Sequence, residues 1–173
     1  MFEDIFALDP KTARVEELAG TSLPPVRKRQ PGIYSEGLIV LVGRSFSRAW
    51  LKDWPGLTDR LEPFAYTALG DVFCWDRQKH CVQYLTVQEG SLDDVADSID
   101  HLLDEVLVRQ EVIDDFLLRP FVGEIRSLHG PLQYGQCYIS IPWQMLGGGA
   151  DPKQYDPGAV DVYLSLIGQT HFG

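Results

Sequence analysis

The apolar residues in the first half of the chain fall into short runs of strand length. Gly37–Val42 is a run of aliphatic and β-branched residues bounded by glycines, which predicts a buried strand. Val72–Trp75 and Val82–Val87 are two more such runs, and the polar stretch Arg77–His80 between them is typical of a hairpin turn. Leu61–Tyr66 is apolar, but the spacing of its residues does not decide between a strand and a helix. The pattern therefore predicts strands that pair in a sheet.

After residue 90 the apolar positions recur at spacings of three and four, which is the period of a helix. We expect a helix over residues 91–106 with Ser91 as its N-cap, and a second helical stretch that Pro120 limits. The aspartates between the apolar positions are expected to face outward. The inward positions are Leu92, Val95, Ile99, Leu102, Leu103 and Val106 in the first helix, and Val112, Ile113, Phe116 and Leu117 in the second.

Two further segments carry helix signals, and one segment near the C-terminus leaves the choice open. Residues 9–20 have helix punctuation at both ends, including a closing Gly20, and residues 45–54 have apolar side chains at helical spacing. Residues 134–141 predict a strand, whereas residues 160–167 fit a strand or a helix. Together the elements predict an α+β fold, in which a mostly antiparallel sheet is covered by amphipathic helices in a single compact body.

The net charge of the 173 residues is −10, and most of it lies in about a fifth of the chain. Residues 91–124 hold 10 acidic and 2 basic residues. A general nucleic-acid binder needs the opposite balance, because neutralising phosphates supplies most of its non-specific affinity. Two interpretations of the acidic segment are a solvated helical face and a surface that captures a basic partner. The basic trio Arg27-Lys28-Arg29 is interpreted as a solvated loop.

The sequence also excludes several kinds of site. It has no apolar run that could span a membrane and no basic-then-apolar leader, so we expect a cytoplasmic protein. Cys74, Cys81 and Cys137 are too scattered for a disulfide framework and are predicted to be free thiols. The histidines have no metal-ligand spacing, and no nucleophile elbow or phosphate-binding loop is present. We therefore expect a binding protein without metal, cofactor or enzyme activity.

Glycine, proline and strand landmarks follow one another in an order that resembles a known family. The landmarks are Thr67–Phe73, Val82–Val87, Gly90-Ser91 with the acidic stretch after it, Gly130-Pro131-Leu132, Tyr134–Tyr138, Pro142 and Gly147-Gly148. In this respect residues 64–173 resemble the Tdi-type immunity domain of bacterial type VI secretion systems. Residues 1–63 are similar to the GAD-like domain that commonly precedes it, through Leu23-Pro24, Tyr34–Leu38 and Ser45–Trp54.

The resemblance implies an immunity protein that neutralises a cognate secreted toxin, often a DNase. Together with the charge pattern it leads to the hypothesis that an acidic surface occupies the active site or DNA groove of a basic nuclease. Two other hypotheses stay open: a non-catalytic regulatory module without a toxin, and a small ligand-binding protein or enzyme that uses Gly147–Gly149. The candidate partner-binding residues are Asp93, Asp97, Asp100, Asp104, Asp114, Asp115 and Trp143.

Overall fold

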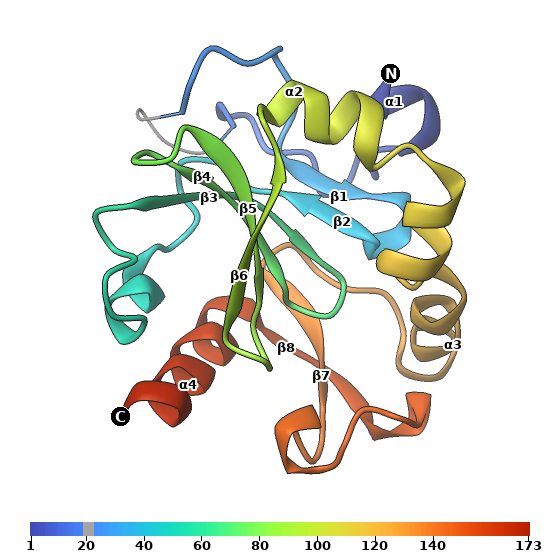
Figure 1. The fold of residues 1–173 in the computed structure, drawn as a ribbon. Coiled ribbons are helices and arrows are strands. Elements are labelled where there is room, and N and C mark those ends of the chain that lie inside the picture. Colours follow the sequence, from blue (N-terminus) through green and yellow to red (C-terminus); the bar gives the residue numbers. More distant parts are fainter. Residues whose placement is uncertain (19–22) are drawn as a thin grey trace.

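A six-stranded antiparallel sheet, whose strands lie side by side in sequence order, forms the centre of the protein (Figure 1). The structure is a computed structural model, and it describes residues 1–18 and 23–173. The strands are β1 (Gly32–Tyr34), β2 (Ile39–Leu41), β3 (Leu61–Thr67), β4 (Val72–Asp76), β5 (Cys81–Thr86) and β6 (Ser91–Ala96). The strand predicted at Gly37–Val42 and the hairpin around Arg77–His80 are confirmed as β2 and as β4–β5. The predicted fold class is also confirmed.

The two edges of the sheet have different surroundings. The N-terminal segment covers the outer edge of β1: the Asp9 N–H donates to the Ile33 carbonyl at 2.9 Å, and the Ser35 N–H donates to the Ala7 carbonyl at 2.8 Å. β6 forms the opposite edge, and no strand in the described part of the chain pairs with its outer side. The peptide groups along that side of β6 are therefore left without a strand partner.

The helix expected over residues 9–20 is wrong for the part that the structure describes. The Arg14 N–H donates to the Pro31 carbonyl at 2.8 Å, and Leu18 forms a bridge with Gly43. The sheet therefore takes up backbone groups that a helix would have needed for its own hydrogen bonds. The expected closing residue, Gly20, lies outside the described residues. Residues 45–54 contain only a short 3₁₀ helix, Ala49–Asp53.

The helix expected to begin at residue 91 begins eight residues later. Ser91–Ala96 pair with β5 instead, because the ladder hydrogen bonds of a sheet edge are available to this segment. The true N-cap is Ser98, whose hydroxyl oxygen accepts a hydrogen bond from the His101 N–H at 3.1 Å. A sheet neighbour thus overrides the helical spacing of Leu92 and the residues that follow it.

The helical region after β6 is irregular. Its elements are α2 (Ile99–His101), two π-helical turns at Leu102–Val106 and Val112–Phe116, and α3 (Arg119–His129). The expectation that Pro120 limits the second stretch needs correction. Leu118 adopts a left-handed conformation with φ 56°, and Pro120 lies in the first turn of α3, where its missing N–H costs no helical hydrogen bond. Helix α3 itself was not expected.

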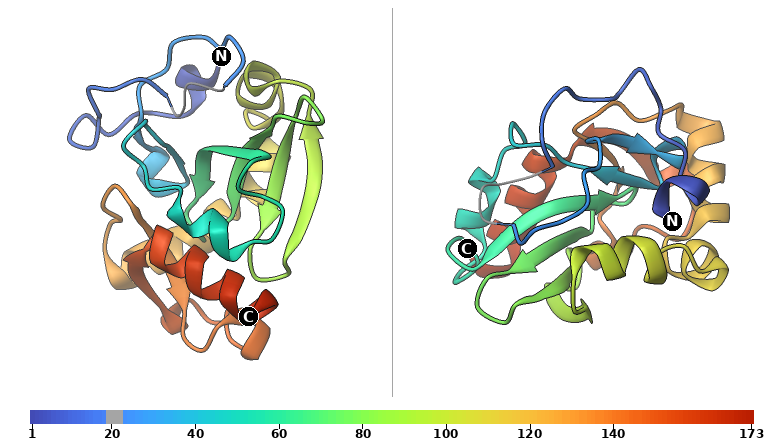
Figure 2. Two further views of the ribbon diagram at one scale, coloured as in Figure 1. Left: turned by 90° about the vertical axis from the view of Figure 1, so that its left-hand side faces the viewer. Right: turned by 90° about the horizontal axis from the view of Figure 1, so that it is seen from above.

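A smaller lobe completes the fold. β7 (Gln136–Ser140) confirms the strand predicted at residues 134–141, and it pairs antiparallel with β8 (Tyr155–Ala159). The open choice for residues 160–167 is resolved as a helix, α4 (Val160–Phe172). Figures 1 and 2 show α4 and the β7–β8 sheet at the end of the molecule away from α1 (Phe2–Ile5).

One hydrophobic core joins the segments that the sequence assigns to two domains. β3 runs across the expected boundary between residues 63 and 64, so residues from both sides contribute to the same sheet. The largest buried side chains, which include Trp50, Trp54 and Phe73, belong to a single cluster. Cys74, Cys81 and Cys137 are free thiols. The division at residue 63 itself stays a prediction.

Candidate partner-binding surface

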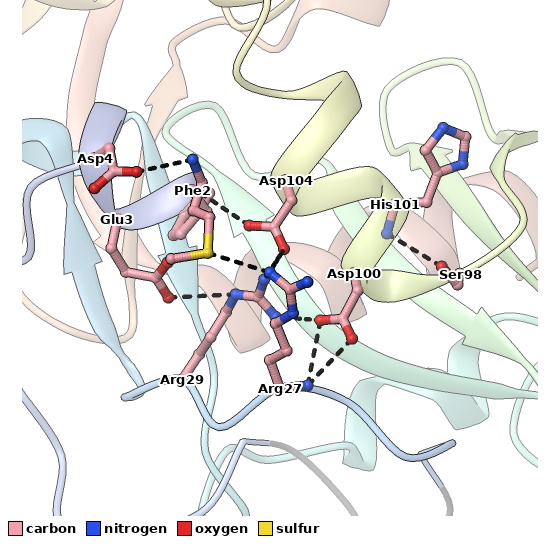
Figure 3. A network of polar contacts seen from close by, with 10 residues as sticks. Phe2, Glu3, Asp4, Arg27, Arg29, Ser98, Asp100, His101 and Asp104 are labelled. Carbon is pink, nitrogen blue, oxygen red and sulfur yellow. Dashed lines mark hydrogen bonds and ion pairs between the residues drawn. The ribbon is translucent and has the colours of Figure 1, made fainter.

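Two of the predicted partner-binding aspartates hold a buried arginine inside the protein. Asp100 and Asp104 lie four residues apart and both contact the guanidinium of Arg29, whose side chain is only 1% exposed (Figure 3). The Asp104 carboxylate lies 2.7 Å from Nη2, and the Glu3 carboxylate lies 3.4 Å from Nε. Arg29 is therefore not in a solvated loop, as the sequence indicated, but ties that loop to the helical region and α1.

The surroundings of Asp104 explain why this carboxylate stays charged although it is mostly buried. Its Oδ1 accepts the Phe2 N–H at 2.9 Å, and its Oδ2 lies 3.0 Å from Nη1 of Arg27. Burial alone would raise the pKa of Asp104, but the Phe2 N–H and the Arg29 guanidinium outweigh burial and lower it. The side chain is 12% exposed. The expectation that it faces outward is wrong, because its partner Arg29 lies inside.

A second group of acidic residues forms ion pairs at the surface. Asp114 lies 2.6 Å from Nη2 of Arg119. Asp94, which was not among the candidates, lies 3.0 Å from Nζ of Lys79. Ion pairs this exposed contribute little to stability, since solvent screens them. They do reduce the local negative charge that a partner would meet at these two positions.

The remaining candidates on the acidic segment are Asp93, Asp97 and Asp115. All three are exposed, and none forms an ion pair with any residue in the described ranges. Glu105, Glu111 and Glu124, in the helical region, are also exposed and unpaired within those ranges. The acidic residues that are free to meet a partner are therefore these six, which we call the open acidic surface.

Trp143 does not belong to this surface. It lies in the segment between β7 and β8, which Figure 1 shows at the far end of the molecule from α2. Trp143 is half-buried and packs against the hydrophobic core. The sequence therefore grouped two distant places of the fold, and only the aspartates share one region.

The backbone amides of the glycine-rich tract next to Trp143 form hydrogen bonds with neighbouring residues of the same segment. The N–H groups of Gly147 and Gly148 donate to the Gln144 and Trp143 carbonyls at 2.9 and 3.1 Å, and the Gly149 N–H donates to the Gln154 side chain at 3.1 Å. A β-carbon at Gly148 would lie 1.7 Å from the Pro142 carbonyl oxygen. These contacts favour a packing role for the tract over anion binding through its backbone.

The described residues include no group of three or more histidine, cysteine, aspartate or glutamate side chains that could hold a metal ion. Among the same residues, no helix has both the length and the apolar character needed to cross a bilayer.

Sequence reasoning did not single out Asp71, whose carboxylate is strongly desolvated. Asp71 accepts the Val87 N–H at 2.8 Å and the Tyr84 hydroxyl at 3.0 Å, and so fastens the β3–β4 turn to the end of β5. Burial raises its pKa to about 6, although both hydrogen bonds oppose the shift. Its position in the Thr67–Phe73 landmark was the only signal in the sequence.

Replacing Asp71 by Asn is expected to change how stability depends on pH. Because the pKa of Asp71 is raised on folding, from 3.8 to about 6, its contribution is full at low pH and is lost as the pH rises through about 6. Relative to wild type, Asp71→Asn should therefore become more stable by about 2–3 kcal/mol between pH 4 and pH 7. Urea unfolding of both proteins across this range measures the difference. A difference that does not change with pH would contradict the prediction.

Phe116 has two contrasting faces. One packs inward, with its ring centroid 4.7 Å from that of Tyr84 and 6.4 Å from that of Phe73. The other is open to solvent, so that the residue is 41% exposed. The predicted inward orientation is therefore only half correct.

Comparisons with known proteins bear on both the fold and the family. Residues 96–171 match the family model described as T6SS immunity protein Tdi1, C-terminal. The crystal structure of Atu4351 from Agrobacterium tumefaciens is similar to this chain with a TM-score of 0.66 and 15% identity, over 96% of this chain and 86% of that one. At this identity the likeness shows the fold alone. No curated protein matches the chain. The Tdi-type resemblance is thus supported, and the GAD-like resemblance of residues 1–63 stays a prediction.

Proposed function

We propose that this chain is an immunity protein that binds a cognate secreted antibacterial toxin and neutralises it without catalysing a reaction. The observation that carries the proposal is the match of residues 96–171 to the type VI secretion immunity family. These residues include α2, α3, the β7–β8 sheet and most of α4, which together make up the C-terminal part of the fold. The role is therefore proposed for a substantial structural unit and not for a short motif.

The proposed toxin is a basic nuclease whose active site or DNA groove the open acidic surface covers. A nuclease must present positive charge to the phosphates of its substrate, and a surface of one negative sign competes for the same groove. Asp93, Asp97 and Asp115 support this assignment because their charges are exposed and have no partner within the described ranges. Asp100, Asp104 and Asp114 contribute to the field, but each already pairs with an arginine of this chain: Arg29 for the first two and Arg119 for Asp114.

The test is association with the purified products of the genes next to the gene of this chain, among which the proposal expects a basic nuclease toxin. Replacing Asp93, Asp97 and Asp115 together by Asn should slow association about 10-fold at low ionic strength, because exposed charges act mainly on the rate of encounter. The difference from wild type should shrink as salt rises, since the Debye length is about 8 Å at physiological ionic strength. Stopped-flow or surface-binding kinetics at several salt concentrations measure both effects.

A matched control changes the same amount of charge elsewhere. Asp59, Glu89 and Asp156 are exposed and lie outside the acidic segment, so their replacement by Asn, Gln and Asn should leave the association rate nearly unchanged. Equal rates for the two triple variants would exclude the open acidic surface as the binding site. Failure of the wild-type chain to bind or inhibit the toxin would refute the proposed function itself.

A further inference from the structure

Two apolar side chains are exposed in the C-terminal part of the acidic segment, residues 91–124. Phe116 is 41% exposed and Leu118 is 38% exposed, and they follow directly after Asp114 and Asp115. Single exposed apolar residues are normal on protein surfaces, so exposure alone indicates nothing. What distinguishes this pair is how the backbone and the neighbouring side chains hold it.

The backbone holds the pair in an unusual conformation. The residues up to Phe116 form a π-helical turn, and Leu118 lies in the left-handed region at φ 56° and ψ 41°. This region is unfavourable for a leucine, whereas asparagine or glycine enters it readily. Leu117 between them is buried, and hydrogen bonds from the Leu117 N–H to Val112 and from the Val122 N–H to Leu118 fix the turn at 2.8 and 2.9 Å. Strained backbone of this kind is concentrated at functional sites.

The ring of Phe116 is also held in place before any partner arrives. It packs against Tyr84, with 4.7 Å between the ring centroids, and the Tyr84 hydroxyl is in turn bonded to Asp71. An aromatic side chain that is already ordered loses little conformational freedom on binding. Phe116 therefore has the properties of an interface anchor: it is aromatic, partly exposed and immobilised.

Acidic residues border the ring from two different elements. Asp93 on β6 is the direct cross-strand partner of Tyr84, so its side chain lies on the face of the sheet that Tyr84 shares with Phe116. Asp115 precedes Phe116 in the chain. Both acids are exposed and lack an ion pair within the described ranges. Arg119, which follows Leu118, is paired with Asp114, so the free charges of Asp93 and Asp115 next to the apolar pair are negative.

We propose that Phe116 and Leu118 form the apolar centre of the toxin-binding surface, with Asp93 and Asp115 as its charged border. The partner that fits is a basic protein surface with an apolar pocket for the Phe116 ring beside its cationic groups. A second copy of this chain fits less well, because its own acidic border would face this one and like charges repel. This inference rests on the proposed function, since it names the anchor of the same toxin-binding surface.

The test measures the association and dissociation rate constants of the complex with the toxin. Together they separate the role of the apolar anchor from the role of the charges. Leu118→Asn removes the apolar side chain while favouring the left-handed backbone, so the variant should fold at least as stably as wild type. We expect its complex with the toxin to dissociate about 10-fold faster, with little change in the association rate. Phe116→Ala should also speed the dissociation of the complex, and by a larger factor. Thermal unfolding of the free variants monitors their folding.

Leu146→Asn is the matched control, because Leu146 is 68% exposed but lies in the segment between β7 and β8. Its complex should dissociate at the wild-type rate.

The inference is overturned if the complexes of Leu118→Asn and Phe116→Ala both dissociate like that of wild type while the triple aspartate variant still associates slowly. The proposed function then stands. Self-association of the free chain that Leu118→Asn abolishes would also overturn it, by assigning the face to a second copy. A wild-type chain that does not bind the toxin removes the proposed function and this inference together.

Discussion

Replacing Arg29 by Met should lower the free energy of unfolding by about 3–5 kcal/mol, the typical cost of removing one partner from a buried ion pair. The substitution keeps the length of the apolar stem but leaves Asp100, Asp104 and Glu3 without the cation that they share. The effect should be largest near neutral pH. Because the pKa of Asp104 is lowered in the folded protein, its stabilising contribution is present above about pH 4 and is lost as the pH falls further. Urea unfolding of both proteins at several pH values measures the loss.

The matched variant adds Asp100→Asn and Asp104→Asn to Arg29→Met. It replaces the two carboxylates that Arg29→Met leaves without their shared cation, so it should recover a large part of the lost stability. The same two substitutions in the wild-type background should be destabilising, because Arg29 would then be buried with Glu3 alone. If Arg29→Met unfolds at the wild-type urea concentration, the arginine does not tie the loop, α1 and the helical region together.

Replacing Trp54 by Ala should also cost about 3–5 kcal/mol, because a large buried side chain is removed from a packed site. Trp54 is 1% exposed, and its indole N–H donates to the Leu164 carbonyl of α4 at 2.9 Å. Gly168 allows this close approach, since a β-carbon there would lie 2.6 Å from the indole nitrogen. The variant should therefore loosen α4 before the sheet. Hydrogen exchange of α4 amides, together with urea unfolding, measures both effects.

Trp143→Ala provides the comparison, because Trp143 is only half-buried and packs against the outside of the hydrophobic core. Its cost should be clearly smaller than that of Trp54→Ala. Equal losses for the two tryptophans, with unchanged exchange of the α4 amides, would show that Trp54 does not fasten this helix.

The candidate partner-binding surface on the acidic segment could be predicted from the sequence only in part. The excess of aspartate and glutamate over residues 91–124 is visible in the sequence and correctly marks a charged region. Which of these charges stay free depends on Arg27, Arg29 and Lys79, which lie far away along the chain. The left-handed Leu118 had no signal either, because leucine in this region is stabilised by contacts and not by its own preference.

Local sequence determined the elements whose signals act within a few residues. β2, the β4–β5 hairpin and β7 formed where apolar runs and turn residues predicted them, because strand pattern and tight turns are short-range properties. Tertiary structure decided the others. Ser91–Ala96 became a strand because β5 offered an edge to pair with, and residues 9–18 gave up a helix for contacts with β1 and Gly43. Arg29 became buried because three carboxylates from α1 and the helical region converge on it. The partners of residues 9–18 and of Arg29 lie far away in the chain, whereas β5 precedes Ser91–Ala96 in a hairpin and acts through strand pairing. Local propensity carries no information about either kind of contact.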